Sequence, residues 1–146
     1  MGLQIQILKA GNEHAFARVA PGVFDEPIDA RLVAEFLADP HHHIAAAIED
    51  DMIIGFVSAV DYIHPDKPRE LWINEVGVAP SHHRRGIARQ VLDCMLDHGR
   101  NLGCRQAWVL TERPNIAAMR LYQSTGGLVH SPETVMFDFD LTARKE

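Results

Sequence analysis

One segment constrains the fold more than any other, the run VGVAPSHHRRGIARQVLDCMLDHG from Val76 to Gly99. It begins with apolar, β-branched residues, breaks at Pro80, passes through two histidines and two arginines, and reaches Gly86 before a helix-periodic stretch. This order predicts a strand, a short turn and an amphipathic helix in direct succession. A mixed α/β architecture follows, with cationic side chains gathered where the strand turns into the helix.

That strand-to-helix turn has the features of an anion site. A glycine before a helix lets the backbone approach a ligand, and the first helical turn leaves amides without intrahelical partners. Those amides and the helix dipole attract anions, and Arg84, Arg85 and Arg89 add charge suited to a pyrophosphate. The dinucleotide and Walker patterns are absent, so another phosphate-bearing cofactor is predicted. The alternative is a solvated helix start in an acidic protein.

The rest of the chain alternates strands and helices without internal repeats. Alternating or β-branched runs predict strands over residues 3–7, 43–49, 52–62, 71–79, 106–112 and 133–141. Helical spacing predicts helices over residues 12–19, 29–39 and 115–127, and a helix that starts at Ile87 and is closed by Gly99 or Gly103. The acidic pair Asp50–Asp51 predicts a hairpin turn, and Gly77 with Pro80 predicts a bulge in the strand before the arginines.

Composition limits the kind of protein this can be. With 146 residues, 47% of them hydrophobic, residues 1–146 are interpreted as a single domain. A formal charge of -6 argues against nucleic-acid binding and favours a cationic small-molecule partner. Cys94 and Cys104 form no disulfide or zinc motif, and the N-terminus lacks a signal sequence. The longest apolar stretch, residues 52–60, is too short to cross a membrane, so a cytoplasmic protein is expected.

Two motifs resemble those of the GNAT superfamily of N-acetyltransferases, which use acetyl-coenzyme A. The pattern [QR]xxGx[GA] corresponds to residues 83–88, with His83 where Gln or Arg is usual. The pattern NxxAxxLYxxxG is matched at every position by Asn115, Ala118, Leu121, Tyr122 and Gly126. Segment order matches over residues 3–141, and residues 25–40 and 133–141 look like the aminoglycoside 3-N-acetyltransferase branch.

The resemblance implies a GNAT fold, a splayed, mostly antiparallel mixed sheet of about six or seven strands with about four helices. The strand with Val76 would part from the strand with Trp108, and the pantetheine arm of the coenzyme would lie in the gap. The implied coenzyme-binding residues are Val76, Gly77, Val78, His83, Arg84, Arg85, Gly86, Ile87, Ala88, Arg89, Asn115, Ala118 and Tyr122. Asn115 has the simpler alternative of a helix cap.

Acetyl transfer to an amine needs an unprotonated nitrogen and a proton for the departing thiolate. An alkyl ammonium is only about one part in a thousand neutral at pH 7. Glu75 is the predicted base, although a surface or arginine-paired glutamate is the alternative. Tyr122 is the predicted acid, the alternative being a core tyrosine. The Val78 amide would meet the oxyanion.

Acceptor selectivity is expected from acidic and aromatic groups at loops and strand ends, because an acidic mouth attracts polyamine or amino-sugar cations. The predicted substrate-binding residues are Asp25, Glu26, Tyr62, Glu75 and Asp138. The run His41–His43 lacks companion ligands at metal-binding spacing, so no metal site is predicted. Trp72 and Trp108 lie in predicted strands and are interpreted as core or interface residues.

Direct acetyl transfer is favoured over a covalent intermediate, because Cys94 lies mid-helix and is a poor acyl carrier. Two other functions remain open. One is a coenzyme A binding or sensing protein without turnover, and the other is a protein or peptide N-acetyltransferase. A homodimer is expected from the resemblance alone.

Overall fold

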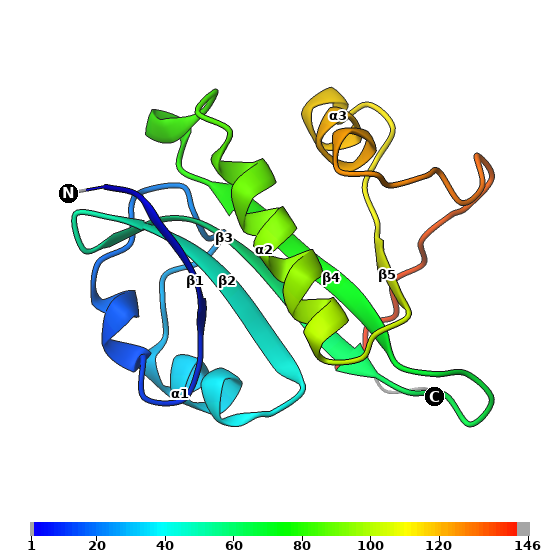
Figure 1. The fold of residues 1–146 in the computed structure, drawn as a ribbon, viewed down its shortest axis with the longest axis horizontal. Coiled ribbons are helices and arrows are strands. Elements are labelled where there is room, and N and C mark those ends of the chain that lie inside the picture. The colour runs from blue at the N-terminus through cyan, green and yellow to red at the C-terminus, as the bar shows by residue number, and fades with distance from the viewer. Residues whose placement is uncertain (1, 143–146) are drawn as a thin grey trace.

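Five strands form one sheet in the order β1-β2-β3-β4-β5 (Figure 1). They are β1 (Gln4–Leu8), β2 (His42–Glu49), β3 (Met52–Tyr62), β4 (Glu70–Val78) and β5 (Gln106–Val109). Neighbouring strands are antiparallel, except that β4 and β5 are parallel. The structure is a computed structural model that describes residues 2–142.

Three α-helices accompany the sheet in the described part of the chain, α1 (Ala30–Ala38), α2 (Ile87–Asn101) and α3 (Ile116–Ser124). Two short 3₁₀ helices, η1 (Glu13–Ala17) and η2 (Pro80–His82), precede α1 and α2. The Asp29 side chain caps α1 by accepting hydrogen bonds from two backbone amides of its first turn. The expected six or seven strands and four helices are therefore wrong for residues 2–142, which contain five strands and three α-helices.

The hairpin between β2 and β3 forms as predicted. Asp50 and Asp51 both have positive φ values, 53° and 61°, as a two-residue turn of the favoured hairpin type requires. The hairpin aligns His43 with Ala59 and Ala45 with Val57, which gives the centre of the sheet a continuous buried core.

Helix α2 covers one face of the sheet and buries Ile87, Val91, Leu92 and Met95 against it (Figure 1). The helix approaches the sheet closely at Gly99, where a methyl group would lie 2.9 Å from Leu71 Cδ2. Leu71 therefore faces α2, and the alternation of side chains along β4 directs Trp72 to the opposite face.

The bulge in β4 lies at Asn74, so the prediction of a bulge at Gly77 and Pro80 is wrong. Ile73 pairs with Ala59 and Glu75 with Ser58, which leaves Asn74 as the extra residue on β4. Because Ala59 and Ser58 are adjacent on β3, Ile73 and Glu75 face opposite sides of the sheet. Without the extra residue, Glu75 would face α2 as Ile73 does.

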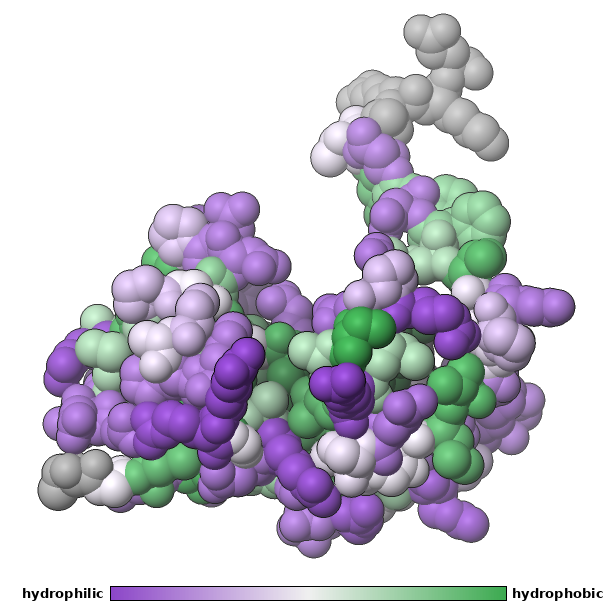
Figure 2. Space-filling model, turned by 90° about the horizontal axis from the view of Figure 1, so that it is seen from above, coloured by the Kyte–Doolittle hydropathy of each residue, from purple (hydrophilic) through white to green (hydrophobic). Residues whose placement is uncertain are grey.

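The predicted strand over residues 133–141 does not form. This segment has no regular secondary structure, and its apolar side chains are exposed, from 67% at Met136 to 92% at Leu141. Figure 2 shows apolar side chains standing away from the body of the molecule beside the chain terminus. The alternating pattern is real, but a strand also needs a partner, and this segment pairs with neither edge strand of the sheet, β1 or β5.

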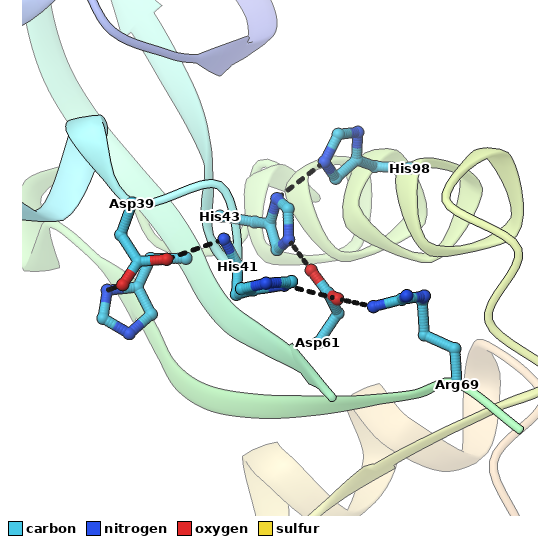
Figure 3. A network of polar contacts seen from close by, with 7 residues as sticks. Asp39, His41, His43, Asp61, Arg69 and His98 are labelled. Atoms are coloured by element: carbon cyan, nitrogen blue, oxygen red, sulfur yellow. Dashed lines mark hydrogen bonds and ion pairs between the residues drawn. The ribbon is translucent and has the colours of Figure 1, made fainter. Parts of the chain in front are cut away.

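A polar network lies between β2, β3 and α2 (Figure 3). Asp61 accepts hydrogen bonds from His43 Nε2 (2.5 Å), His41 Nδ1 (3.1 Å) and Arg69, while His98 Nε2 lies 2.9 Å from His43 Nδ1. Since the carboxylate can only accept, His43 donates to Asp61 through Nε2, and its Nδ1 forms a hydrogen bond with His98 Nε2. Burial raises the pKa of Asp61, but the hydrogen bonds from its partners outweigh this and lower it overall. His41 and His43 thus serve this network, and residues 2–142 contain no cluster of side chains that could hold a metal ion.

Candidate active site

The strands β4 and β5 pair along only part of their length and then diverge (Figure 1). Their pairing runs from Glu70 opposite Gln106 to Ile73 opposite Val109. The Ala79 amide donates to the Ile54 carbonyl at 2.8 Å, so Ala79 turns its backbone amide and carbonyl toward β3. Every second residue before it along β4 does the same, back to the bulge. Val76 and Val78 therefore turn their amides and carbonyls away from β3 and into the gap. The strands part as the family resemblance implied.

The loop between β4 and α2 borders a cavity of about 180 Å³. Arg84 and Gly86 both have positive φ values, 65° and 72°, and α2 begins directly after Gly86. The two sequence motifs meet here, because the lining combines this loop with α3. The lining residues are Val78, His82, His83, Arg84, Gly86, Ile87, Ala88, Arg89 and Leu121. Figure 2 views the molecule from this end and shows a notch in its outline between two lobes.

The cationic side chains of the loop have different partners. His83 Nε2 donates to the Val78 carbonyl at 3.0 Å, so this histidine reaches the edge of β4 that faces the gap. Arg85 instead forms two hydrogen bonds to the Glu49 carboxylate, at 3.1 and 2.6 Å, and these lower the pKa of Glu49. Arg85 thereby ties the loop to the end of β2, and Arg84 and Arg89 remain to line the cavity.

Glu75 is an exposed side chain on the face of the sheet opposite α2. Its neighbour on that face is Gly77, where a methyl group would lie 2.4 Å from the Val23 carbonyl and 2.8 Å from the Phe56 ring. The chain around Val23 therefore crosses directly over β4 beside Glu75. Asp25 and Glu26 follow in the same loop and are exposed, which adds acidic groups to this side of the sheet.

Helix α3 begins and ends with interactions that its motif residues make. The Asn115 side chain accepts a hydrogen bond from the Ala118 amide at 3.1 Å, so Asn115 is a helix cap. Tyr122 is half-buried, and burial raises its pKa, which keeps the phenol protonated near neutral pH. The Gly127 amide donates to the Tyr122 carbonyl at 2.8 Å, and a side chain on Gly127 would collide with that carbonyl. The double glycine thus closes the helix tightly behind Tyr122.

Two predicted substrate-binding residues lie apart from Glu75. Tyr62 is opposite Glu70, four residues of β3 beyond Ser58, which is about 13 Å along the strand. Its hydroxyl donates to Glu70 at 3.2 Å and accepts from Trp108 Nε1. Asp138 is an exposed residue of the C-terminal segment that forms no strand.

The interpretation of Trp72 as a core residue is wrong, and its interpretation as an interface residue stays a prediction. Trp72 is 39% exposed and stacks on Trp108 across β4 and β5. The two tryptophans and Glu75 share one face of the sheet. Strict alternation along the sequence would place Trp72 and Glu75 on opposite faces, but the extra residue Asn74 brings them to the same face. A bulge at Asn74 has no signal in the sequence comparable to a glycine or proline.

A family model, Acetyltransferase (GNAT) family, matches residues 12–127. The chain belongs to the GNAT acetyltransferase family, whose members are acyltransferases that use acetyl-coenzyme A. It is 32% identical over 104 residues to N-alpha-acetyltransferase RimI of Mycobacterium tuberculosis, covering 71% of this chain and 63% of that protein. It is 30% identical over 106 residues to aminoglycoside N(6')-acetyltransferase type 1 of Salmonella typhimurium, covering 68% of this chain and 73% of that one.

Solved structures share the fold. An aminoglycoside acetyltransferase from an uncultured soil metagenomic sample, in complex with sisomicin, has a TM-score of 0.80 at 16% identity and covers 95% of this chain and 96% of its own. The structure of AAC(6')-Iy in complex with a bisubstrate analogue of coenzyme A has a TM-score of 0.71 at 26% identity. The match covers 96% of this chain and 99% of that one. No helix within residues 2–142 is long and apolar enough to span a membrane.

Proposed function

We propose that the protein is an acetyl-coenzyme A dependent N-acetyltransferase that transfers the acetyl group directly to a primary amine of a small cationic acceptor. The observation that carries this proposal is the bulge at Asn74. It directs the Glu75 side chain to one face of β4, while Val76 and Val78 present backbone groups to the gap beside β5. A single short stretch of strand thus offers a carboxylate for the acceptor and hydrogen bonds for the coenzyme.

The residues around the gap fit coenzyme A. The backbone groups of Val76 and Val78 are available to the amide-bearing pantetheine arm, as an added strand would use them. The amides at the start of α2 and the side chains of Arg84 and Arg89 would hold the diphosphate. When the coenzyme binds, the His83 side chain would either give up its hydrogen bond to the Val78 carbonyl or keep it and lie beside the pantetheine arm. When bound, the coenzyme supplies an acetyl thioester.

Glu75 and Tyr122 have complementary tasks in this proposal. The Glu75 carboxylate takes a proton from the ammonium form of the acceptor, directly or through water, and so leaves the nitrogen free to attack the acetyl carbonyl. The Val78 amide, which points into the gap, would donate to the carbonyl oxygen as negative charge develops there. Tyr122 stays protonated because burial raises its pKa, so its phenol holds a proton for the departing sulfur.

A cationic acceptor is supported by the formal charge of -6 and by the acidic residues Asp25, Glu26 and Glu75 on one side of the sheet. The relatives act on different amines according to their names, one being an N-alpha-acetyltransferase and another an aminoglycoside N(6')-acetyltransferase. The aminoglycoside 3-amino group suggested by the resemblance is a further candidate. A peptide acceptor and a coenzyme sensor without turnover are the alternatives that the experiment must separate.

The test is an acetyl transfer assay that follows thiol release with a panel of aminoglycosides, polyamines and peptides. The variants Glu75→Gln and Tyr122→Phe should each lower kcat by roughly 10²–10⁴-fold while leaving acetyl-coenzyme A binding intact. Glu35→Gln, an exposed change on α1, is the matched control and should leave the rate unchanged. Coenzyme binding without thiol release for any amine would favour a sensor, and unchanged rates in both variants would remove the assigned roles.

A further inference from the structure

An exposed aromatic pair lies on the same face of the sheet as Glu75. Trp72 on β4 is directly opposite Trp108 on β5, and their rings are parallel within 4° at a centroid distance of 5.1 Å. Trp72 keeps 39% of its surface exposed in this arrangement. Large aromatic residues usually bury such a surface, so an exposed indole that stacks on a second indole is a candidate contact for a ligand.

Hydrogen bonds hold this pair in place from one side. Trp108 Nε1 donates to the Tyr62 hydroxyl, and that hydroxyl donates to Glu70 Oε1 at 3.2 Å. His64 lies with its Nε2 atom 3.7 Å from the other Glu70 oxygen and its ring against Tyr62. Trp108 is therefore fixed by its indole nitrogen, and Trp72 is fixed by stacking on Trp108. A surface that is rigid before binding loses little conformational entropy when a ligand packs against it.

The register of the sheet gives the spacing between this pair and the candidate base. Trp72 is opposite Val60, and Glu75 is opposite Ser58, two residues away on β3. Two residues of strand correspond to about 7 Å. That separation suits one ring whose face lies on Trp72 and whose exocyclic amine reaches Glu75. A linear amine would have no ring face to place there.

We propose that Trp72, supported by Trp108, determines acceptor specificity by stacking against one face of the ring of a ring-bearing primary amine whose nitrogen reaches Glu75. This inference rests on the acetyl transfer proposed above, but the binding that it describes can be measured without turnover. Charge complementarity favours a cation at this face, because Asp25 and Glu26 lie in the loop that crosses β4 beside Glu75. An aromatic face further favours a cationic ligand.

The chain itself provides the probe, since Trp72 and Trp108 are its only tryptophans. Intrinsic tryptophan fluorescence is titrated with neamine as an amino-sugar ring, tyramine as an aromatic ring, and spermidine as a linear amine, all without coenzyme. Neamine or tyramine should change the tryptophan emission in a saturable manner, and spermidine should not. Which of the two rings binds more tightly distinguishes a sugar from an aromatic acceptor.

Calorimetry on variants then separates a contact from a structural effect. Trp72→Ala should weaken binding of the ring-bearing amine by roughly three- to tenfold, and Trp72→Phe should restore most of it. Leu32→Ala, which removes an exposed apolar side chain from α1, should leave binding unchanged. Thermal unfolding of each variant verifies that the fold is retained.

Equal binding of ring-bearing amines to the original protein and to Trp72→Ala would overturn the inference. So would an absence of binding by every ring-bearing amine, or an equal loss of affinity for spermidine. If the ring-bearing amine binds through Trp72 but no acetyl is transferred, the specificity surface stands and the proposed enzymatic activity fails.

Discussion

The buried carboxylate of Asp61 permits a quantitative prediction about stability. Its side chain is 3% exposed and accepts hydrogen bonds from His43, His41 and Arg69 (Figure 3). The substitution Asp61→Asn keeps the shape of the side chain, but its NH₂ group faces a hydrogen-bond donor where the carboxylate oxygen accepted. The Arg69 guanidinium also loses its counter-charge. Removing one partner of a buried pair costs about 3–5 kcal/mol. Such a loss is a large share of the roughly 5–15 kcal/mol that stabilises a typical protein.

The assay is urea and thermal unfolding followed by circular dichroism at pH 7. A loss of about 3–5 kcal/mol should lower the midpoint of thermal unfolding by roughly 10 °C. Asp39→Asn is the matched control from the same region (Figure 3). Asp39 is half-exposed, accepts from the His41 amide at 2.8 Å and keeps that acceptor as asparagine, so the change should cost less than about 1 kcal/mol.

The pH dependence of the same comparison adds a second test. The folded pKa of Asp61 is lowered from its ordinary value of 3.8, so its carboxylate stabilises the fold above that value. This contribution is lost as the pH falls through the folded pKa. The difference in free energy of unfolding between the original protein and Asp61→Asn should therefore shrink only below about pH 4. This role of Asp61 would be refuted if Asp61→Asn and Asp39→Asn lowered the free energy of unfolding at pH 7 by amounts within about 1 kcal/mol of each other. It would also be refuted if the difference between the original protein and Asp61→Asn shrank already near pH 6.

Two further predictions concern the helix and the loop that flank the site. The pKa of His98 is lowered by burial and by His43, so the unfolded chain binds protons more readily and stability should fall as the pH drops below about 6.5. His98→Gln should flatten this slope in urea titrations, and an unchanged slope would contradict the assignment. Gly77→Ala places a methyl group 2.4 Å from the Val23 carbonyl, so it should cost about 1–3 kcal/mol and raise KM for the amine. A fully stable variant with unaltered kinetics would show that the loop does not depend on this contact.

Local sequence signals predicted much of the fold because they act over a few residues. The hairpin follows from two aspartates that tolerate positive φ, and α2 follows from its apolar stripe after Gly86. The capping of α3 by Asn115, the simpler alternative for this residue, follows from its side-chain chemistry. The two motifs that line the cavity were identified together for the same reason, since each is contiguous.

Features that depend on partners distant in the sequence were missed. The bulge at Asn74 is defined by the register between β3 and β4, and the sequence around it offers Gly77 and Pro80 as stronger bulge signals. The alternation over residues 133–141 predicts a strand but contains no information about a free edge. His43 and Asp61 are 18 residues apart, and only folding brings them together.

In the proposed function the amides after Gly86 hold the diphosphate of coenzyme A, and a single binding measurement can test this role. Gly86 and Gly103 flank α2, both have positive φ values, 72° and 88°, and a methyl group at either position meets no atom within 4 Å. Alanine therefore strains both sites similarly, but only Gly86 lines the cavity. In calorimetry with coenzyme A, Gly86→Ala should bind at least about tenfold more weakly, a loss of about 1.4 kcal/mol, and Gly103→Ala should match the original protein. Equal affinity of the two variants, or no binding by the original protein at millimolar coenzyme, would contradict the account.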